Sequence, residues 1–135
     1  MKIEGGCHCG AVRYEAEADP GNAGICHCTD CQNLSGSPYV AYIQVAAATF
    51  KLLRGTPKIY IKVAESGTRR AQAFCPECGS RLWSAAEKDT PAYSLRLGGV
   101  RQRAQLAPQK QGWCNSSLPW SGNLAGIKSH PRNPG

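Results

Sequence analysis

Apolar and polar residues alternate over residues 11–18, and this period of two is typical of a strand with one buried face. The face that we expect to be buried carries Val12, Tyr14, Ala16 and Ala18. Four turn-forming residues follow at 19–22. The chain should therefore reverse there, in a hairpin-like layout, before it reaches the second group of cysteines.

Six more apolar runs are strand candidates, and breakers rich in Gly and Pro separate them at intervals of about ten residues. They are Tyr39–Val45, Phe50–Leu53, Lys58–Val63, Ala71–Phe74, Arg81–Ser84 and Tyr93–Leu97. One helical turn is expected at Thr29–Leu34, with Thr29 as its N-cap. The pattern predicts a mainly β fold of small antiparallel sheets in a single domain over residues 1–127. Residues 128–135 have little to bury and should form a flexible tail.

Composition agrees with a small β domain. A chain of 135 residues with 15 Gly and 9 Pro needs many turns and has room for one modest core. No segment approaches the ~20 apolar residues of a membrane span, and the first residues lack the apolar core of a signal peptide. We therefore expect a cytoplasmic protein with no membrane partner, whose cysteines stay reduced.

The formal net charge of +7 is concentrated in the last third of the chain. Residues 90–135 contain six Lys or Arg and no acid, whereas residues 1–89 contain ten basic and nine acidic residues. Seven thiolates and two zinc ions would lower the net charge by three, to +4, which argues against nucleic acid as the partner. The basic segment fits attraction of a small anionic ligand or, equally, solubility alone.

Seven of the eight cysteines fall into three clusters with the spacing of metal ligands. Sulfurs around a tetrahedral zinc ion lie roughly 3.8 Å apart, so ligands tend to come in local pairs. Residues 7–10 offer one pair, which we expect in extended chain, and residues 75–79 offer another in a tight turn. Together they predict a closed structural zinc site whose ligands are Cys7, Cys9, Cys75 and Cys78.

The remaining cluster offers Cys26, Cys28 and Cys31 within six residues. Three protein ligands and an exchangeable fourth position are what catalytic zinc requires, so we expect a second zinc ion here. Alternatively, a remote residue closes the site, and Cys114 is the candidate fourth ligand. A disulfide network is a further alternative.

The histidines are weaker candidates. His8 and His27 each lie between two ligand cysteines, so they should point away from the metal, and His130 lies in the expected tail.

These motifs resemble those of the glutathione-dependent formaldehyde-activating enzyme family. The matching stretches are GCHCGAVRY (6–14), CHCTDCQ (26–32) followed by SGS (35–37), FCPECGSRLW (74–83) and LPW (118–120). The resemblance implies a tent of small antiparallel sheets and the same partition into one structural and one catalytic zinc. It also implies an activity, the joining of glutathione and formaldehyde into S-hydroxymethylglutathione, which is formally a carbon–sulfur lyase reaction run backwards.

Further candidates follow if the partner is a small-molecule thiol such as glutathione. Glutathione carries net negative charge, so Arg96, Arg101 and Arg103 are either its carboxylate binders or solvated surface arginines. Trp113 and Trp120 either wall a pocket or belong to the core. The alternative function is a non-catalytic zinc module that binds protein or nucleic acid, and its motivation is the basic last third of the chain.

Overall fold

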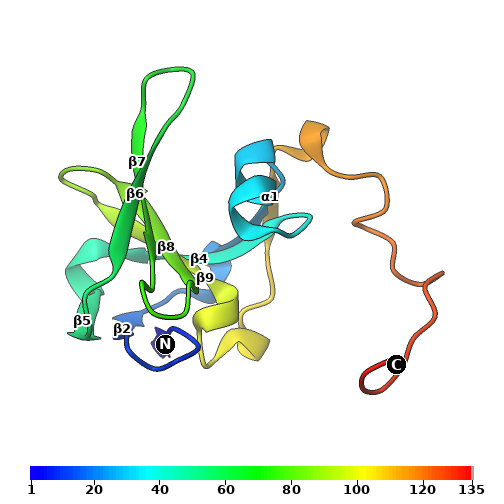
Figure 1. Cartoon of the computed structure of the whole chain (residues 1–135), viewed down its shortest axis with the longest axis horizontal. Coiled ribbons are helices and arrows are strands. Elements are labelled where there is room, and N and C mark those ends of the chain that lie inside the picture. The colour runs from blue at the N-terminus through cyan, green and yellow to red at the C-terminus, as the bar shows by residue number, and fades with distance from the viewer. Residues whose placement is uncertain (135) are drawn as a thin grey trace.

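Two β-sheets carry the fold in the computed structural model, which describes residues 1–134 (Figure 1). The smaller sheet is antiparallel and has the order β1-β2-β5, formed by Lys2–Gly6, Arg13–Glu17 and Lys51–Arg54. The larger sheet has seven strands in the order β10-β3-β4-β9-β8-β7-β6. Adjacent strands of this sheet are antiparallel except for β10 and β3, which run parallel. The predicted mainly β fold class is therefore confirmed.

The strands of the larger sheet follow the predicted runs closely. In chain order they are β3 (Ala23–Cys26), β4 (Val40–Ala46), β6 (Lys58–Val63), β7 (Arg69–Phe74), β8 (Arg81–Ala86), β9 (Ala92–Arg96) and β10 (Lys110–Gly112). The expected strands over residues 39–97 all appear, with ends shifted by one or two residues. The strands β1, β3 and β10 were not expected. Glycines shorten the apolar pattern of β1 and β3, and β10 has no apolar residue.

The expected hairpin around residues 19–22 is wrong. Asp19 accepts the Gly21 N–H at 2.9 Å and caps a short 3-10 turn, η1 (Pro20–Asn22). This turn carries the chain out of the smaller sheet, where β2 lies, and into the larger one, where β3 lies. The hairpin of this region is β1–β2 instead, and the first cysteine pair lies at its tip.

One α-helix, α1 (Thr29–Ser35), follows β3, and short 3-10 turns occur elsewhere. These turns are η2 (Ala47–Thr49), η3 (Leu97–Gly99), η4 (Arg103–Gln105) and η5 (Cys114–Ser116). The predicted N-cap Thr29 is wrong by one residue. Cys28 has the extended backbone of an N-cap, and its side chain accepts the Cys31 N–H at 3.3 Å.

The core draws residues from both sheets, and a group of aromatic rings forms part of it. Tyr14, Phe50, Trp83 and Tyr93 contact one another with ring centroids 4.4 to 5.8 Å apart. Gly5 allows the Tyr14 ring to lie over β1, because a Cβ at Gly5 would come within 2.4 Å of that ring. The predicted buried face of residues 11–18 is confirmed, with Tyr14 and its neighbours at positions 12, 16 and 18 all buried.

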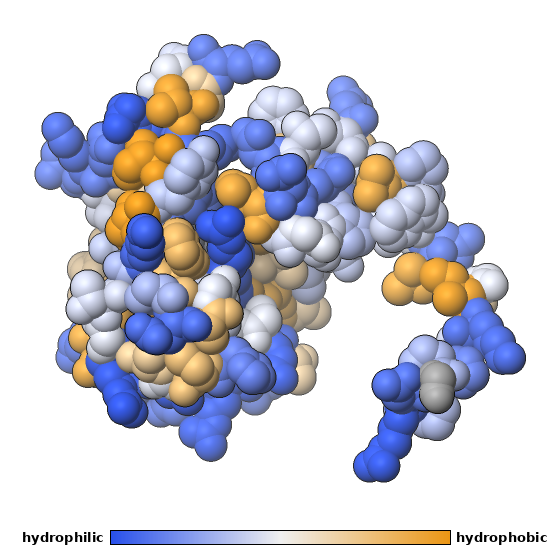
Figure 2. Space-filling view, viewed as in Figure 1, coloured by the Kyte–Doolittle hydropathy of each residue, from blue (hydrophilic) through white to orange (hydrophobic). Residues whose placement is uncertain are grey.

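The β6–β7 hairpin stands away from the body of the molecule (Figure 1). Apolar side chains follow this hairpin on the surface in Figure 2, and they include Ile59 and Val63 of the edge strand β6. Lys58 and Lys62 interrupt this edge, and such charges hinder pairing with another strand. Within residues 1–134 no helix is long and apolar enough to cross a membrane.

The chain after η5 runs away from the two sheets and contains turns but no strand in the part described (Figure 1). Trp113 is 69% exposed and Trp120 is 56% exposed, so neither belongs to the core. Trp120 instead lines a surface depression together with α1 residues such as Gln32. The domain limit at residue 127 stays a prediction.

Candidate metal centres

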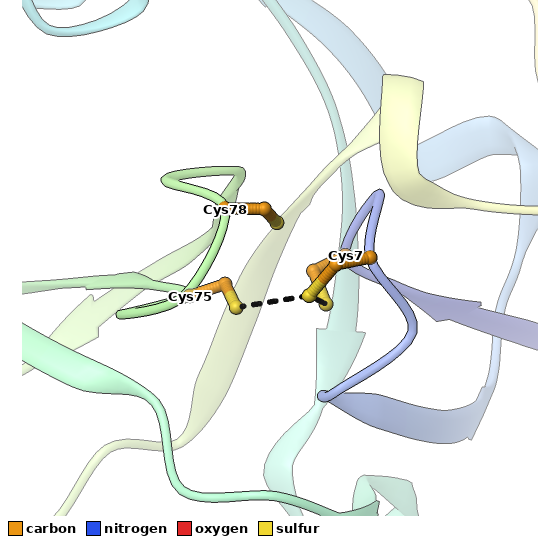
Figure 3. A group of neighbouring side chains, drawn as sticks. Cys7, Cys75 and Cys78 are labelled. Carbon is orange, nitrogen blue, oxygen red and sulfur yellow. Dashed lines mark hydrogen bonds between the residues drawn. The ribbon is translucent and has the colours of Figure 1, made fainter.

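Four cysteine thiols converge where the two sheets meet, and Figure 3 shows three of them labelled. Cys7 and Cys9 come from the β1–β2 connection, and Cys75 and Cys78 come from the β7–β8 turn. The Sγ atoms of Cys7 and Cys9 lie 3.6 Å apart, and those of Cys9 and Cys75 lie 3.8 Å apart. All four Sγ atoms lie within 4.8 Å of one another. This spacing fits a tetrahedral metal ion held by four thiolates.

Both loops of the four-cysteine cluster are tight turns. The Gly79 N–H donates to the Cys75 carbonyl at 2.9 Å, and Gly79 has φ +77°. This confirms the tight turn predicted at residues 75–79, in which a glycine permits the positive φ. The extended chain expected at Cys7 is wrong. The Gly10 N–H donates to the Cys7 carbonyl at 3.3 Å, and Gly10 has φ +85°, so residues 7–10 also form a turn. This turn brings both of its sulfurs to the metal position.

Ser80 joins the two loops, and the sequence reasoning missed it. Its Oγ accepts the His8 N–H at 3.0 Å and lies 3.2 Å from the Cys78 Sγ. Hydrogen bonding from the Ser80 side chain and backbone lowers the pKa of Cys78 to about 5. The Val12 N–H donates to the Cys7 Sγ at 3.2 Å in the same way. These donors favour thiolates, which are the form that binds metal.

The second cluster lies where β3 ends and α1 begins. Cys26 is the last residue of β3, Cys28 caps α1, and Cys31 lies in its first turn. Their three Sγ atoms lie within 4.8 Å of one another, and all three residues are half-buried. The strand end, the cap and the first helical turn thus aim three thiols at one point within six residues.

Electrostatics distinguish the three thiols. Burial opposes ionisation of Cys28, but hydrogen bonds from Cys31 and the charge of Lys62 lower the pKa of Cys28 below its ordinary value. Burial, together with the neighbouring thiols, raises the pKa of Cys31. Lys62 comes from the edge strand β6 and also forms an ion pair with Asp30 of α1 at 3.0 Å. A metal ion would remove the competition among the thiols, because all its thiolate ligands are deprotonated.

Among residues 1–134, the mutually close ligand atoms at this site come from these three cysteines, and the Sγ of Cys114 is not one of them. Cys114 is exposed and lies in a cavity wall with His27 and Gln111. The parallel pairing of β10 with β3 brings this segment past the cluster. Gln32 of α1 strengthens the arrangement by donating to the carbonyls of His27 at 2.8 Å and Ser116 at 2.9 Å.

His27 is buried, and among residues 1–134 its ring nitrogens are not part of the group of mutually close ligand atoms formed by the three thiols. Its ring contacts Tyr39, and its Nε2 lies 2.8 Å from the Oε1 of Gln111. Because an amide oxygen accepts only, the Nε2–H of His27 is the donor in this hydrogen bond. His8 is exposed.

A cavity of about 760 Å³ opens beside the four-cysteine cluster. Its charged and titratable lining is Arg13, Arg81, Arg96, Arg101, Arg103, Glu4, Cys7 and His8. The sequence-based candidates Arg96, Arg101 and Arg103 therefore all line one cavity. Arg13 and Arg81 were missed as site residues, although both lie inside cysteine motifs.

Arg96 connects this cavity with the three-cysteine cluster. It is half-buried on β9 and donates to the side-chain oxygen of Gln72 at 3.2 Å. Burial lowers the pKa of Arg96, while the thiols of Cys31 and Cys26 oppose that shift and so lie within its electrostatic reach. Arg81, beside it, donates from Nε to the carbonyl of Leu34 in α1 at 3.2 Å.

Two cysteine clusters of metal-binding geometry lie on a small, mainly β domain, next to a cavity lined by arginines. This combination defines a class of small β proteins whose cysteines could hold two metal ions. Residues 2–116 match the family described as glutathione-dependent formaldehyde-activating enzyme, and the chain belongs to that family. The family resemblance seen in the motifs is confirmed.

Two individual comparisons add to this. A Halomonas elongata protein, whose name assigns it to the glutathione-dependent formaldehyde-activating enzymes, is 32% identical over 90 residues. The aligned region covers 62% of this chain and 55% of that protein, so the chain spans about half the length of this relative. A crystal structure of a Rhodobacter sphaeroides protein aligns with a TM-score of 0.62 over 80% of this chain and 98% of the other, at 20% identity. That likeness concerns the fold alone.

Proposed function

We propose that this protein is a zinc-dependent carbon–sulfur lyase that joins a thiol such as glutathione to formaldehyde or another small aldehyde. The observation that carries the proposal is the cluster of Cys26, Cys28 and Cys31, whose three Sγ atoms could hold one metal ion. A tetrahedral zinc ion on these three ligands would have a fourth position for a reactant. Membership of the formaldehyde-activating family supports the choice of reaction.

Zinc suits both clusters by donor chemistry, since thiolates are ligands that it prefers. Cys7, Cys9, Cys75 and Cys78 would hold a structural ion, and the other three cysteines would hold a catalytic one. When bound, zinc would supply a Lewis acid that favours the ionised form of an incoming thiol at neutral pH.

The reaction forms one carbon–sulfur bond. The thiol sulfur adds to the carbonyl carbon of the aldehyde, and the proton lost from the thiol ends on the aldehyde oxygen. The chain contributes orientation and charge. Arg96 is the cationic side chain that we expect to supply this charge, because it lines the cavity and lies within electrostatic reach of Cys26 and Cys31. An anionic sulfur that develops near this guanidinium is stabilised.

The alternative of a non-catalytic module that binds nucleic acid has less support. Three of the six basic residues in 90–135 line the cavity instead of forming an extended surface for phosphates. A titration against duplex DNA at rising salt tests this, since phosphate contacts would give steep salt dependence.

The decisive experiment for the proposed function combines metal content with cobalt substitution. We expect two zinc ions per chain. In the cobalt form, thiolate charge-transfer intensity reports the number of sulfurs, and added glutathione should raise it by one sulfur at an open site. Cys114→Ser is the matched control. If this variant has fewer sulfurs at the metal, Cys114 is the fourth ligand and the site is closed.

Acceleration of adduct formation is then measured by exchange spectroscopy on formaldehyde and glutathione. Acceleration by the zinc-loaded protein, and its loss in Cys28→Ser, are the expected results. No acceleration by the zinc-loaded protein would overturn the formaldehyde version of the proposal.

A further inference from the structure

The outer edge of the larger sheet is an apolar strand that lacks a second neighbour. β6 ends the strand order, and within residues 1–134 it pairs with β7 alone. The Ile59 side chain is 45% exposed and that of Val63 is 57% exposed. The hairpin that carries them stands away from the body of the molecule in Figure 1, and apolar side chains follow it in Figure 2. The outer side of β6 is therefore open to a partner.

β6 presents unpaired backbone groups at every second residue. The Ala64 N–H donates to the Thr68 carbonyl at 2.9 Å, on the side of β6 that faces β7. Along an antiparallel strand, the backbone groups of successive residues point alternately to the two sides. The groups of residues 58, 60 and 62 thus face β7, and those of Ile59, Ile61 and Val63 face outward. An edge of this kind can accept one more strand.

The side chains of these three outward-facing residues form one apolar row. They lie on the same face of the sheet, and the register places Ile59 opposite Ala73, which belongs to the core. The row therefore continues the core face of the sheet beyond β7, where less of the protein covers it. Residues 58, 60 and 62 lie on the opposite face. A strand that matches β6 would thus alternate apolar and polar side chains.

Charge identifies the kind of strand that fits this edge. Residues 50–64 contain four Lys or Arg and no acid. Lys62 forms an ion pair with Asp30, whereas Lys51, Arg54 and Lys58 have no ion-pair partner among residues 1–134. A second copy of β6 would bring like charges together, and so would the last third of this chain, since residues 90–135 contain no acid. The lysines that hinder pairing with such strands would attract an acidic one.

We propose that the outer edge of β6 binds an extended, acidic segment of a partner protein as an additional strand. The apolar side chains of that segment pack beside the apolar row, and its carboxylates lie beside Lys58. Backbone hydrogen bonds to the outward-facing residues supply affinity, and the alternating side chains supply specificity. The inference does not depend on the reaction proposed above.

Amide hydrogen exchange of the metal-loaded full chain tests the mode of binding, with a short end-blocked peptide of alternating glutamate and valine as the probe. In the free protein, the amides of Ile59, Ile61 and Val63 should exchange faster than those of residues 58, 60 and 62, which are bonded to β7. Peptide at about ten times its Kd should slow the three outward-facing amides about tenfold. A peptide of the same composition, with its glutamates and valines in separate blocks, is the matched control and should bind about tenfold more weakly.

Two variants, followed by calorimetry with the alternating peptide, separate the backbone contribution from the charge. Ile61→Pro removes an outward-facing N–H and should raise Kd about tenfold or more, because edge strands tolerate proline where the N–H faces solvent. Lys58→Glu should raise Kd about threefold or more, since it replaces an attraction by a repulsion. Lys128→Glu, in the exposed C-terminal segment, is the matched charge control and should leave Kd unchanged.

The opposite results are equally clear. Unslowed exchange of the three outward-facing amides, equal binding of the block peptide, or equal weakening by Lys58→Glu and Lys128→Glu would overturn the proposal. A dimer in sedimentation that Ile61→Pro or Lys58→Glu disrupts would also overturn it, because the occupant of the edge would then be a second copy of this chain.

Discussion

Replacement of Cys75 by Ser should unfold the protein, whereas the same change at Cys28 should leave the fold intact. Cys75 is fully buried and belongs to a cluster whose two halves come from different sheets. The neighbouring ligands Cys9 and Cys75 are 66 residues apart in sequence, so the unfolded chain brings them together only at an entropic cost. A metal ion at this site therefore stabilises the folded chain far more than the unfolded one.

The expected loss of stability in Cys75→Ser follows from the contribution of a structural zinc ion and from the total stability of a chain of this length. Structural zinc contributes about 10–16 kcal/mol in small zinc domains, and a chain of 135 residues has roughly 7–20 kcal/mol of total stability. Loss of even a third of the zinc contribution exceeds about 3 kcal/mol. At about 4 °C per kcal/mol for this size, Tm should fall by about 12 °C or more, or the variant should be insoluble.

Cys28→Ser should lower Tm by less than about 4 °C. Serine is a preferred N-cap, so the hydrogen bond to the Cys31 N–H is kept. The three ligands of this cluster lie within six residues, so the unfolded chain can bind metal there as well and the ion stabilises the folded state less.

Melting curves and metal content of the purified variants provide the assay. Cys78→Ser separates the metal from the packing, because Cys78 is exposed yet belongs to the same cluster as Cys75. Cys114→Ser controls for any general effect of losing a thiol. Equal yield, Tm and zinc content for Cys75→Ser and Cys28→Ser would refute the division into a structural and a catalytic site.

Three smaller perturbations test the local arguments. Ser80→Ala should raise the pH midpoint of zinc release, followed with a chelating dye. Ser80 holds the pKa of Cys78 at about 5, below its ordinary value, so the stabilisation is present above the ordinary pKa and is lost as pH falls through about 5; an unchanged midpoint would contradict this. Gly5→Ala should lower Tm by several degrees, because its Cβ would lie 2.4 Å from the Tyr14 ring, whereas Gly98→Ala should not. Lys62→Gln should weaken metal binding at the second cluster, in competition with a chelator, because Lys62 lowers the pKa of Cys28; equal loss at both clusters would argue against this cause.

The grouping of the cysteines could be predicted from the sequence because cysteine spacing is a local property. The turn at residues 75–79 and the helix start near residue 29 need no information from elsewhere in the chain, and both were predicted nearly correctly. The pairing of the first and third clusters was also inferred, because two local pairs complete a tetrahedral set. Each group of neighbouring cysteines lies within six residues or fewer, so its local spacing could be recognised without knowledge of the fold.

What the sequence concealed depends on contacts between distant segments. The hairpin expected at residues 19–22 failed because local turn residues do not reveal which sheet the next strand joins. β10 is three residues long and is formed by parallel pairing with β3, which no local pattern signals. Arg13 lies on the strand face opposite the predicted buried one and is exposed. It reaches the cavity because β1, β2 and the η3 segment meet there.

The four-cysteine cluster and the cavity share a wall, and this links stability to binding. Cys7, His8, Ser80 and Arg81 line the cavity and belong to the two loops, or their immediate continuations, that hold the cluster. A metal ion that fixes these loops would therefore also fix one side of this cavity. Metal binding would order this wall of the cavity beforehand, so a ligand that binds in the cavity would lose less free energy to the ordering of these loops. A chelator that strips the structural ion from Cys28→Ser, a variant in which loss of the second metal cannot be the cause, should consequently loosen these two loops. Hydrogen exchange of the His8 and Gly79 amides should then become faster at a temperature where circular dichroism shows that the strands are kept, and unchanged exchange there would contradict the link between the metal and this wall.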